Sequence, residues 1–214
     1  MADEGSLRER LIDAGVELVL AEGSASVGLR EIARRAGVSH GAPRRYFPTH
    51  QALLSAVGRR GFEDLAAMLG AATAGSATPR GQLDALARAY VGYALERRGM
   101  FELMWRHDLL DGAAQAADQP RLRESTLPLF EAFTGLVARC RAERRAGGTV
   151  EAGPPPEVTA AALWSNLHGM AQLWAWGSLQ LALGAPPSAG DPGDEERDRL
   201  IAAVLDAHLG PVTS

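Results

Sequence analysis

The segment from Leu29 to Leu54 constrains this chain more than any other part of its sequence. It contains five arginines, and Glu31 is its one acidic residue. Apolar residues at helical spacing predict a short helix over 29–36, and Gly37 suits the left-handed residue that ends a helix. Ser39 is a candidate cap for a second, arginine-rich helix that ends near residue 46. Helix, glycine turn and basic second helix are typical of a helix-turn-helix, whose second helix enters the DNA major groove.

The rest of the chain also favours helices. Its 214 residues are 46% hydrophobic and 22% charged. Apolar residues recur at i, i+3, i+4 and i+7, whereas strand-like alternation is almost absent, so the pattern predicts an all-α protein of about nine helices. The expected helices run over 6–22, 29–36, 39–46, 49–72, 79–98, 101–110, 121–145, 157–183 and 194–209, with 157–183 as the longest and Pro128 as a kink or a later start.

A run of small residues at 71–78 divides the expected helices into two groups. The sequence therefore predicts a DNA-binding domain at 1–72 with a three-helix helix-turn-helix, followed by a helical effector-binding and dimerisation domain at 78–214. Charge follows the same division. Residues 1–60 contain nine Arg against seven Asp or Glu, whereas residues 61–214 contain thirteen Arg against nineteen acids. Nucleic-acid contact is therefore expected at the N-terminal end of a chain whose net charge is -4.

Several classes of protein are disfavoured. The sequence shows no H-E-x-x-H, no G-x-S-x-G and no phosphate-binding glycine loop with a lysine, so we expect no enzyme, no cofactor and no metal site. The single cysteine, Cys140, excludes an internal disulfide framework. Polar residues interrupt the most apolar segment, 158–183, and the N-terminus is acidic, so we expect no membrane segment, no secretory signal and a cytoplasmic location.

Motifs in both halves resemble the TetR family of one-component transcriptional regulators. The segment LREIARRAGVS and the step Phe47-Pro48-Thr49 into the following helix carry the resemblance over residues 7–69. In the C-terminal half, Trp164, His168 and Gly169 are similar to the Trp-His-Gly motif of one branch of that family. The resemblance implies a dimer whose N-terminal domain binds an operator and whose C-terminal domain binds a small molecule.

Three positions depart from the family pattern. Gly28 stands where the family often has Ser or Thr, Arg44 where an aromatic residue is common, and His50 where Lys is common. Histidine attracts phosphate less strongly than lysine at neutral pH. We therefore expect an operator preference of its own for this chain.

The residues expected to contact DNA lie on the second helix of the motif and beside it. Arg44 and Arg45 can each bind guanine O6 and N7 with two hydrogen bonds. Small residues at 41 and 42 allow close approach to bases, with tight packing as the alternative, and Arg30 is a phosphate contact or half of a surface salt bridge. The set is Arg30, Ser39, His40, Gly41, Ala42, Arg44, Arg45, Tyr46, Thr49 and His50.

Aromatic residues and methionines in the C-terminal half predict either a core or an apolar effector cavity. Trp164, His168 and Gln172 recur every four residues and therefore share one helix face. A hydrogen-bonded core histidine is the alternative for His168, and a close helix crossing would explain Gly169. The candidate effector residues are Phe101, Met104, Trp105, Phe130, Trp164, His168 and Gln172.

These features together predict a ligand-responsive regulator, most simply a repressor. It would bind a near-palindromic operator as a homodimer, paired through helices 157–183 and 194–209, and be released by a small, largely apolar effector. Two alternatives remain open: a DNA-binding regulator without a small-molecule effector, controlled by a protein partner, and a helical enzyme that acts on a phosphorylated substrate.

Overall fold

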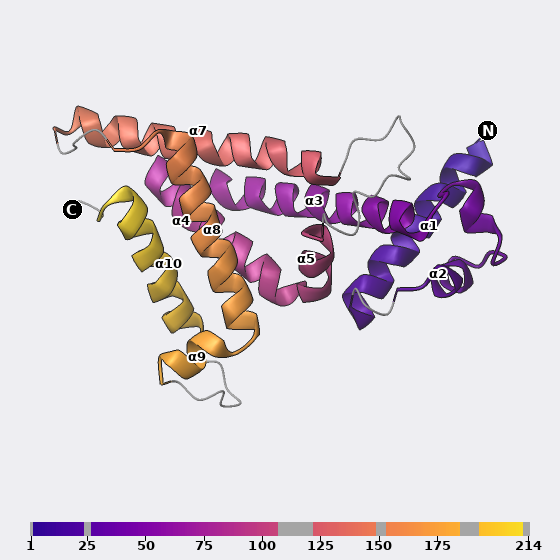
Figure 1. Cartoon of the computed structure of the whole chain (residues 1–214). Coiled ribbons are helices and arrows are strands. Elements are labelled where there is room, and N and C mark those ends of the chain that lie inside the picture. Colours follow the sequence, from indigo (N-terminus) through magenta and orange to yellow (C-terminus); the bar gives the residue numbers. More distant parts are fainter. Residues whose placement is uncertain (1, 24–26, 107–121, 149–152, 185–192, 212–214) are drawn as a thin grey trace. The chain divides into compact units, whose positions relative to one another are not determined.

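The computed structural model describes residues 2–23, 27–106, 122–148, 153–184 and 193–211. Within these ranges the chain forms nine α-helices, two 3-10 helices and no strand, so the predicted all-α class is confirmed (Figure 1). The elements are α1 (Ala2–Glu22), α2 (Leu29–Arg35), η2 (Ala42–Arg45), α3 (His50–Ala74), α4 (Pro79–Glu96), α5 (Arg98–Met104), η3 (Leu122–Thr126), α7 (Leu127–Ala146), α8 (Pro156–Ala175), α9 (Ser178–Ala182) and α10 (Gly193–Leu209).

The chain divides into two compact units. The first comprises Met1–Leu65 and Arg97–Leu127, and the second comprises Ala66–Glu96 and Pro128–Ser214. The boundary falls inside α3, and α5 belongs to the first unit. The functional division into domains at 1–72 and 78–214 stays a prediction, because compactness alone does not assign a role to either part.

The first unit is built around α1, which packs against both α2 and α5. Leu11 and Leu18 of α1 are fully buried, as are Ile32 of α2 and Leu53 of α3. Residues four and seven apart share one face of a helix, so this periodic apolar spacing gives each helix a single face to bury. The resulting core holds the short helix-turn-helix in place.

Gly99 marks a close approach of backbone to backbone in this unit. A Cβ added at Gly99 would lie 2.6 Å from the carbonyl oxygen of Val19 and 2.9 Å from the Cα of Gly23. Backbone atoms cannot move aside as the end of a flexible side chain can. Only glycine therefore allows α5 to approach the end of α1 so closely.

Replacing Gly99 by alanine is expected to lower the free energy of unfolding by about 1–3 kcal/mol, because the new methyl group collides with backbone. Gly92 of α4 is the matched control, since a Cβ there has no neighbour nearer than 4.0 Å. Gly92→Ala should be neutral or stabilising by up to about 1 kcal/mol. Urea unfolding of both variants measures the difference, and equal stability of the two would contradict the close approach.

The second unit contains a layer in which α4, α8 and α10 contact one another. Figure 1 shows α10 running beside α8. Leu83 of α4, Leu163 of α8 and Ile201 of α10 are fully buried. Ion pairs from Arg80 to Asp206 and from Arg88 to Asp198 join α4 to α10 at the edge of this core.

Several expected helix boundaries were wrong. The helix predicted over 101–110 corresponds to α5, which runs from Arg98 to Met104, and residues 107–110 lie outside the described residues. The helix predicted over 157–183 ends at Ala175, because Gly177 adopts φ +76° and α9 starts separately; the longest helix is α3, with 25 residues. For the helix predicted over 121–145, the alternative of a later start at Pro128 is confirmed: residues 122–126 form η3, and α7 begins at Leu127, so that the missing N–H of Pro128 falls in the first turn, where it costs least. The first helix starts at Ala2 rather than at Ser6.

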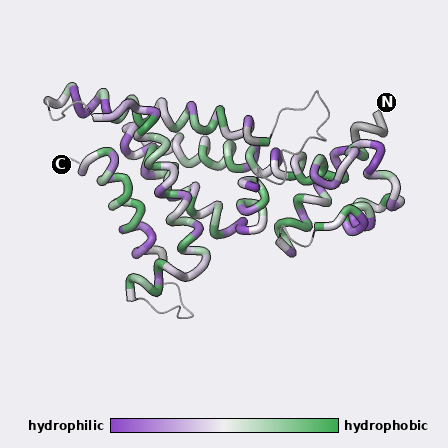
Figure 2. The backbone as a smooth tube through the Cα atoms, in the orientation of Figure 1, coloured by the Kyte–Doolittle hydropathy of each residue, from purple (hydrophilic) through white to green (hydrophobic). Residues whose placement is uncertain are grey.

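Every helix carries both hydrophobic and hydrophilic residues, mixed along its length (Figure 2). In keeping with this, none of the helices in the described ranges is both long and apolar enough to span a membrane.

Candidate functional site

The turn after α2 has the geometry that the sequence predicted. Gly37 adopts φ +68°, and the amide of Val38 donates to the carbonyl of Ala33 at 3.0 Å. The amide of Gly37 also donates to the carbonyl of Arg34 at 3.1 Å. Such backward hydrogen bonds, with glycine in the left-handed region, end a helix and redirect the chain. The prediction for Gly37 is confirmed.

The second element of the motif is shorter than predicted. Residues 39–46 do not form an α-helix; they contain the four-residue 3-10 helix η2. Ser39 accepts the amide of Ala42 through its carbonyl at 3.0 Å, and no side chain caps η2, so the expected hydroxyl cap is wrong. Gly41 and Pro43 account for the difference, since glycine and proline are the two residues least favourable to an α-helix interior.

The inner side of η2 is anchored firmly. Pro43 is buried, and its carbonyl accepts the amides of both Tyr46 and Phe47. Phe47 is only 1% exposed, and the guanidinium of Arg8 lies over its ring at 5.5 Å. The Phe-Pro-Thr step thus holds η2 against the core, and Arg44 and Arg45 lie on the exposed side.

The arginines of the motif differ in their charge partners. Arg34 pairs with Glu31, a hydrogen bond that lowers the pKa of this carboxyl group. In the described part of the chain, Arg30, Arg44 and Arg45 have no ion-pair partner, and all three side chains are exposed. Their charges are therefore available to a phosphate backbone or to guanine edges.

The start of α3 contributes polar groups of two kinds. The hydroxyl oxygen of Thr49 accepts the amide of Ala52 at 3.0 Å, so Thr49 caps α3 and keeps its O–H for another acceptor. His50 is half-buried, and its Nε2 is buried without a hydrogen-bond partner among the described residues. This nitrogen is thus turned away from solvent. The roles of His50 and of the other predicted DNA contacts stay predictions.

In the second unit, α4 and α8 bring three polar aromatic groups together. The indole Nε1–H of Trp164 donates to the hydroxyl oxygen of Tyr90 at 3.0 Å, and this oxygen lies 2.9 Å from Nδ1 of His168. Phe130 meets the edge of the Trp164 ring at 6.3 Å between centroids. The structure thus joins three of the predicted effector residues, together with Tyr90, which the sequence analysis missed. Its place on the apolar face of the helix predicted over 79–98 was the signal that could have identified it.

Burial sets the protonation of this cluster. Tyr90 is only 4% exposed, and desolvation raises the pKa of its phenol, although the hydrogen bond from Trp164 opposes the shift. Desolvation also lowers the pKa of His168. Both groups are therefore neutral near pH 7. The Tyr90 hydroxyl accepts from Trp164, so Nδ1 of His168 is placed to accept a hydrogen bond from it.

The remaining predicted effector residues are placed differently. Phe101, Met104 and Trp105 belong to the first unit, where the Trp105 ring meets that of Phe62 edge-on at 5.1 Å and 89°. A Cβ at Gly61 would lie 2.7 Å from the sulfur of Met104. Gln172, half-buried on α8, follows His168 by one turn. The predicted set therefore divides between two units, and an effector role for either group stays a prediction.

The described residues contain no cluster of three or more His, Cys, Asp or Glu side chains that could hold a metal ion.

Two family models match the chain. One describes bacterial regulatory proteins of the tetR family and matches residues 11–57, which include α2, η2 and the start of α3. The other describes the tetracyclin repressor-like C-terminal domain and matches residues 83–207. The chain belongs to the TetR family. The finer likeness to the Trp-His-Gly branch stays a prediction, since neither match distinguishes branches.

Solved structures agree with this TetR fold. A protein of unknown function from Rhodococcus sp. RHA1 is 28% identical, with a TM-score of 0.70 over 95% of this chain and 93% of its own. RolR in complex with resorcinol has a TM-score of 0.64 at 18% identity, over 98% of this chain and 90% of its own. FadR from Bacillus subtilis in complex with stearoyl-CoA has a TM-score of 0.60 at 13% identity, over 96% of this chain and 99% of its own. No curated protein sequence matches the chain.

Proposed function

We propose that this TetR-family protein is a repressor that binds a near-palindromic operator as a homodimer and leaves it when a small, largely apolar effector binds. One observation carries the DNA-binding role: Arg44 and Arg45 are exposed, have no ion pair with any residue that the structure describes, and lie on an element that Pro43 and Phe47 anchor in the core. Rigid support matters because base recognition requires guanidinium groups held in a defined position.

The cluster of Tyr90, Trp164 and His168 supports the effector role. An apolar site with a few convergent polar groups is the usual composition of a small-molecule pocket. RolR and FadR, which share the fold, were solved with resorcinol and stearoyl-CoA, an aromatic and an acyl ligand. An effector with an aromatic or acyl body and one hydrogen-bonding group would suit the side chains of this cluster.

The outer face of α8 supports the homodimer. Val158 and Trp176 are 55% and 62% exposed, and Leu173 is 39% exposed. Gly169 lies on the same face, and a Cβ there would have no neighbour within 4 Å. The predicted close crossing at Gly169 is therefore absent within the described part of one protomer. A second copy, packed against α8 and α10, would cover these apolar side chains and use the small residue for close contact.

The experiment begins with an operator selected from random DNA duplexes by the wild-type protein. Resorcinol and stearoyl-CoA are then tested as probes, and at least one compound of their aromatic or acyl classes is expected to weaken operator binding at least tenfold and to quench tryptophan fluorescence. Tyr90→Phe, which removes the hydroxyl between Trp164 and His168, should raise the effector concentration needed for release about tenfold, through the lost hydrogen bonds.

Tyr93→Phe makes the same chemical change one turn away on α4 and reports the cost of losing a buried hydroxyl there. An effector response that Tyr90→Phe and Tyr93→Phe alter equally would contradict a specific role of the cluster. If no aromatic or acyl compound alters operator binding, the small-molecule effector is refuted, and control by a protein partner takes its place.

A further inference from the structure

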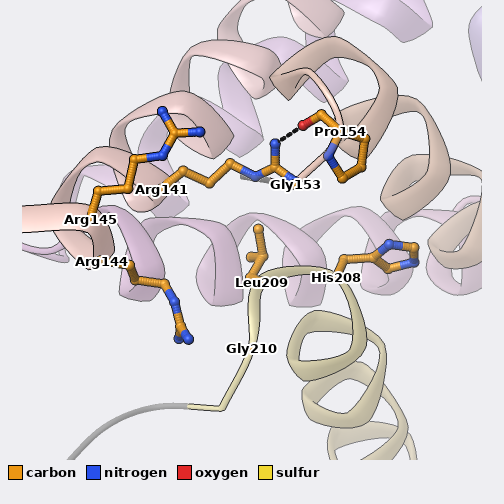
Figure 3. A pocket seen from close by; sticks show the side chains of 8 residues that line it. All are labelled: Arg141, Arg144, Arg145, Gly153, Pro154, His208, Leu209 and Gly210. Atoms are coloured by element: carbon orange, nitrogen blue, oxygen red, sulfur yellow. Dashed lines mark hydrogen bonds between the residues drawn. The ribbon is translucent and has the colours of Figure 1, made fainter. Parts of the chain in front are cut away.

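A cavity in the second unit has a different chemistry from the Tyr90 cluster. It has a volume of about 270 Å³ and lies between the end of α7, the segment before α8 and the end of α10 (Figure 3). A liquid water occupies about 30 Å³, so the space exceeds that of a single ordered water or small ion. Its lining includes Arg141, Arg144, Arg145, Pro154, His208 and Gly210.

Uncharged groups orient Arg141, and a hydrogen bond joins Arg144 to the C-terminal segment. Arg141 extends toward Pro154 in Figure 3 and donates to its carbonyl, as well as to the hydroxyl of Thr159. Arg144 donates to the carbonyl of Pro211 at 2.8 Å. Carbonyl and hydroxyl acceptors orient a guanidinium without neutralising its charge. The contacts of Arg141 therefore hold its positive charge at the cavity wall.

Gly210 shows how closely the C-terminal segment packs against this wall. It adopts φ +78°, and a Cβ there would lie 2.5 Å from a guanidinium nitrogen of Arg144. Arg145 is different: its side chain is exposed and has no ion-pair partner in the described ranges. His208 contacts Asn166 at 2.6 Å and adds an imidazole to the rim.

The local charge is unusual for this half of the protein. Residues 139–145 contain four arginines and one acid, Glu143, although residues 61–214 as a whole are acidic. Two arginines in the last turn of α7 also interact favourably with the negative end of the helix dipole. This interaction explains their presence at a helix end but not their convergence on a cavity. Guanidinium groups pair with phosphate through two parallel hydrogen bonds, so a phosphate group matches this wall in charge and in geometry.

We propose that this cavity binds a soluble, phosphate-bearing small molecule, held by Arg141 and Arg145 while Arg144 keeps the C-terminal segment in place. This site is separate from the effector cluster and does not depend on the proposed repressor function. Pro154 and Leu209 supply apolar surface beside the charged groups, so the remainder of an organic phosphate can pack there.

The test uses the full chain with Arg44→Ala and Arg45→Ala as background, because the DNA-binding face would itself attract phosphate. Inorganic pyrophosphate is the probe, and calorimetry should give a Kd of about 1 mM or tighter. Arg145→Ala and, separately, Arg141→Gln should weaken binding at least about tenfold. Arg199→Ala removes an exposed arginine of α10 that pairs with Glu195, and should leave the Kd within about twofold.

A second readout locates the ligand. The imidazole proton resonances of His208, assigned by loss in His208→Gln, should shift on addition of pyrophosphate and should stay in place in Arg145→Ala. Citrate at equal ionic strength tests whether the site prefers a carboxylate. Vesicles containing phosphatidic acid test whether it binds a lipid headgroup instead of a soluble phosphate. Pyrophosphate binding that survives Arg145→Ala and Arg141→Gln, tighter binding of citrate, or arginine-dependent binding to vesicles alone would each overturn the proposal. Absence of any pyrophosphate binding would do so as well.

Discussion

Replacing Arg44 and Arg45 together by alanine is expected to weaken specific operator binding at least about 100-fold. A guanidinium that binds a guanine edge contributes about 1–3 kcal/mol of discrimination, and a dimer presents each arginine twice. Both side chains are exposed on the 3-10 helix η2 and are not anchored by an ion pair within the described residues, so their removal leaves the core unchanged. Gel retardation on the selected operator measures the loss.

Arg34→Ala is the matched control, because Arg34 is exposed in the same motif but hydrogen-bonded to Glu31 at 2.8 Å. It should keep the operator Kd within about threefold, in line with the small contribution of a surface ion pair. The salt dependence of binding distinguishes phosphate contacts from base contacts by Arg44 and Arg45. Each lost phosphate contact lowers the slope of log K against log salt by about 0.9. Retention of sequence-specific binding by the double variant would refute the assignment of η2 as the recognition element.

Gly169→Arg is expected to turn the homodimer into a monomer, with at least about a 100-fold rise in the dimer dissociation constant. The protomer itself should fold, because a Cβ at Gly169 has no neighbour within 4 Å and arginine favours a helix over glycine by up to about 1 kcal/mol. In the dimer, the substitution would place two bulky charges against each other, which costs several kcal/mol. Sedimentation velocity measures the change, and operator affinity should fall with it.

Gly70→Arg makes the same substitution on α3, at an exposed helical glycine whose Cβ would likewise have no neighbour within 4 Å. This variant should remain dimeric. A dimer that persists in Gly169→Arg would show that the outer face of α8 is not the interface, whatever the oligomeric state of Gly70→Arg. Monomers in both variants would point to a general effect of added charge.

Local sequence predicted the elements whose stability depends on neighbours along the chain. The helix at 29–36, the turn at Gly37 and the helix start at residue 79 all follow from apolar spacing and terminal residues, and the structure contains each of them. At 39–46 the sequence predicted an α-helix, but Gly41 and Pro43 disfavour one and the chain forms the 3-10 helix η2. At residue 177 a glycine stops a helix that apolar residues alone would extend.

Long-range contacts were not accessible in this way. Tyr90 and Trp164 are separated by 74 residues, and only the packing of α4 on α8 brings the phenol within 3.0 Å of the indole nitrogen. Likewise, Phe101 and Trp105 were grouped with Trp164 by composition, whereas α5 packs with α1 in the first compact unit. Periodicity indicates which face of a helix is apolar, but not which other helix covers it.

The all-α class, the helix-turn-helix and the TetR family follow from the sequence, because these depend on spacing, turn residues and motifs within short segments. Tertiary packing was needed to show that η2 is a 3-10 helix anchored by Pro43 and Phe47, and that His168 is a half-buried, neutral partner of Tyr90. It also decided that three arginines of α7 meet the C-terminal segment at a cavity. Burial and charge compensation arise from groups distant in sequence, so they exist only once the chain has folded.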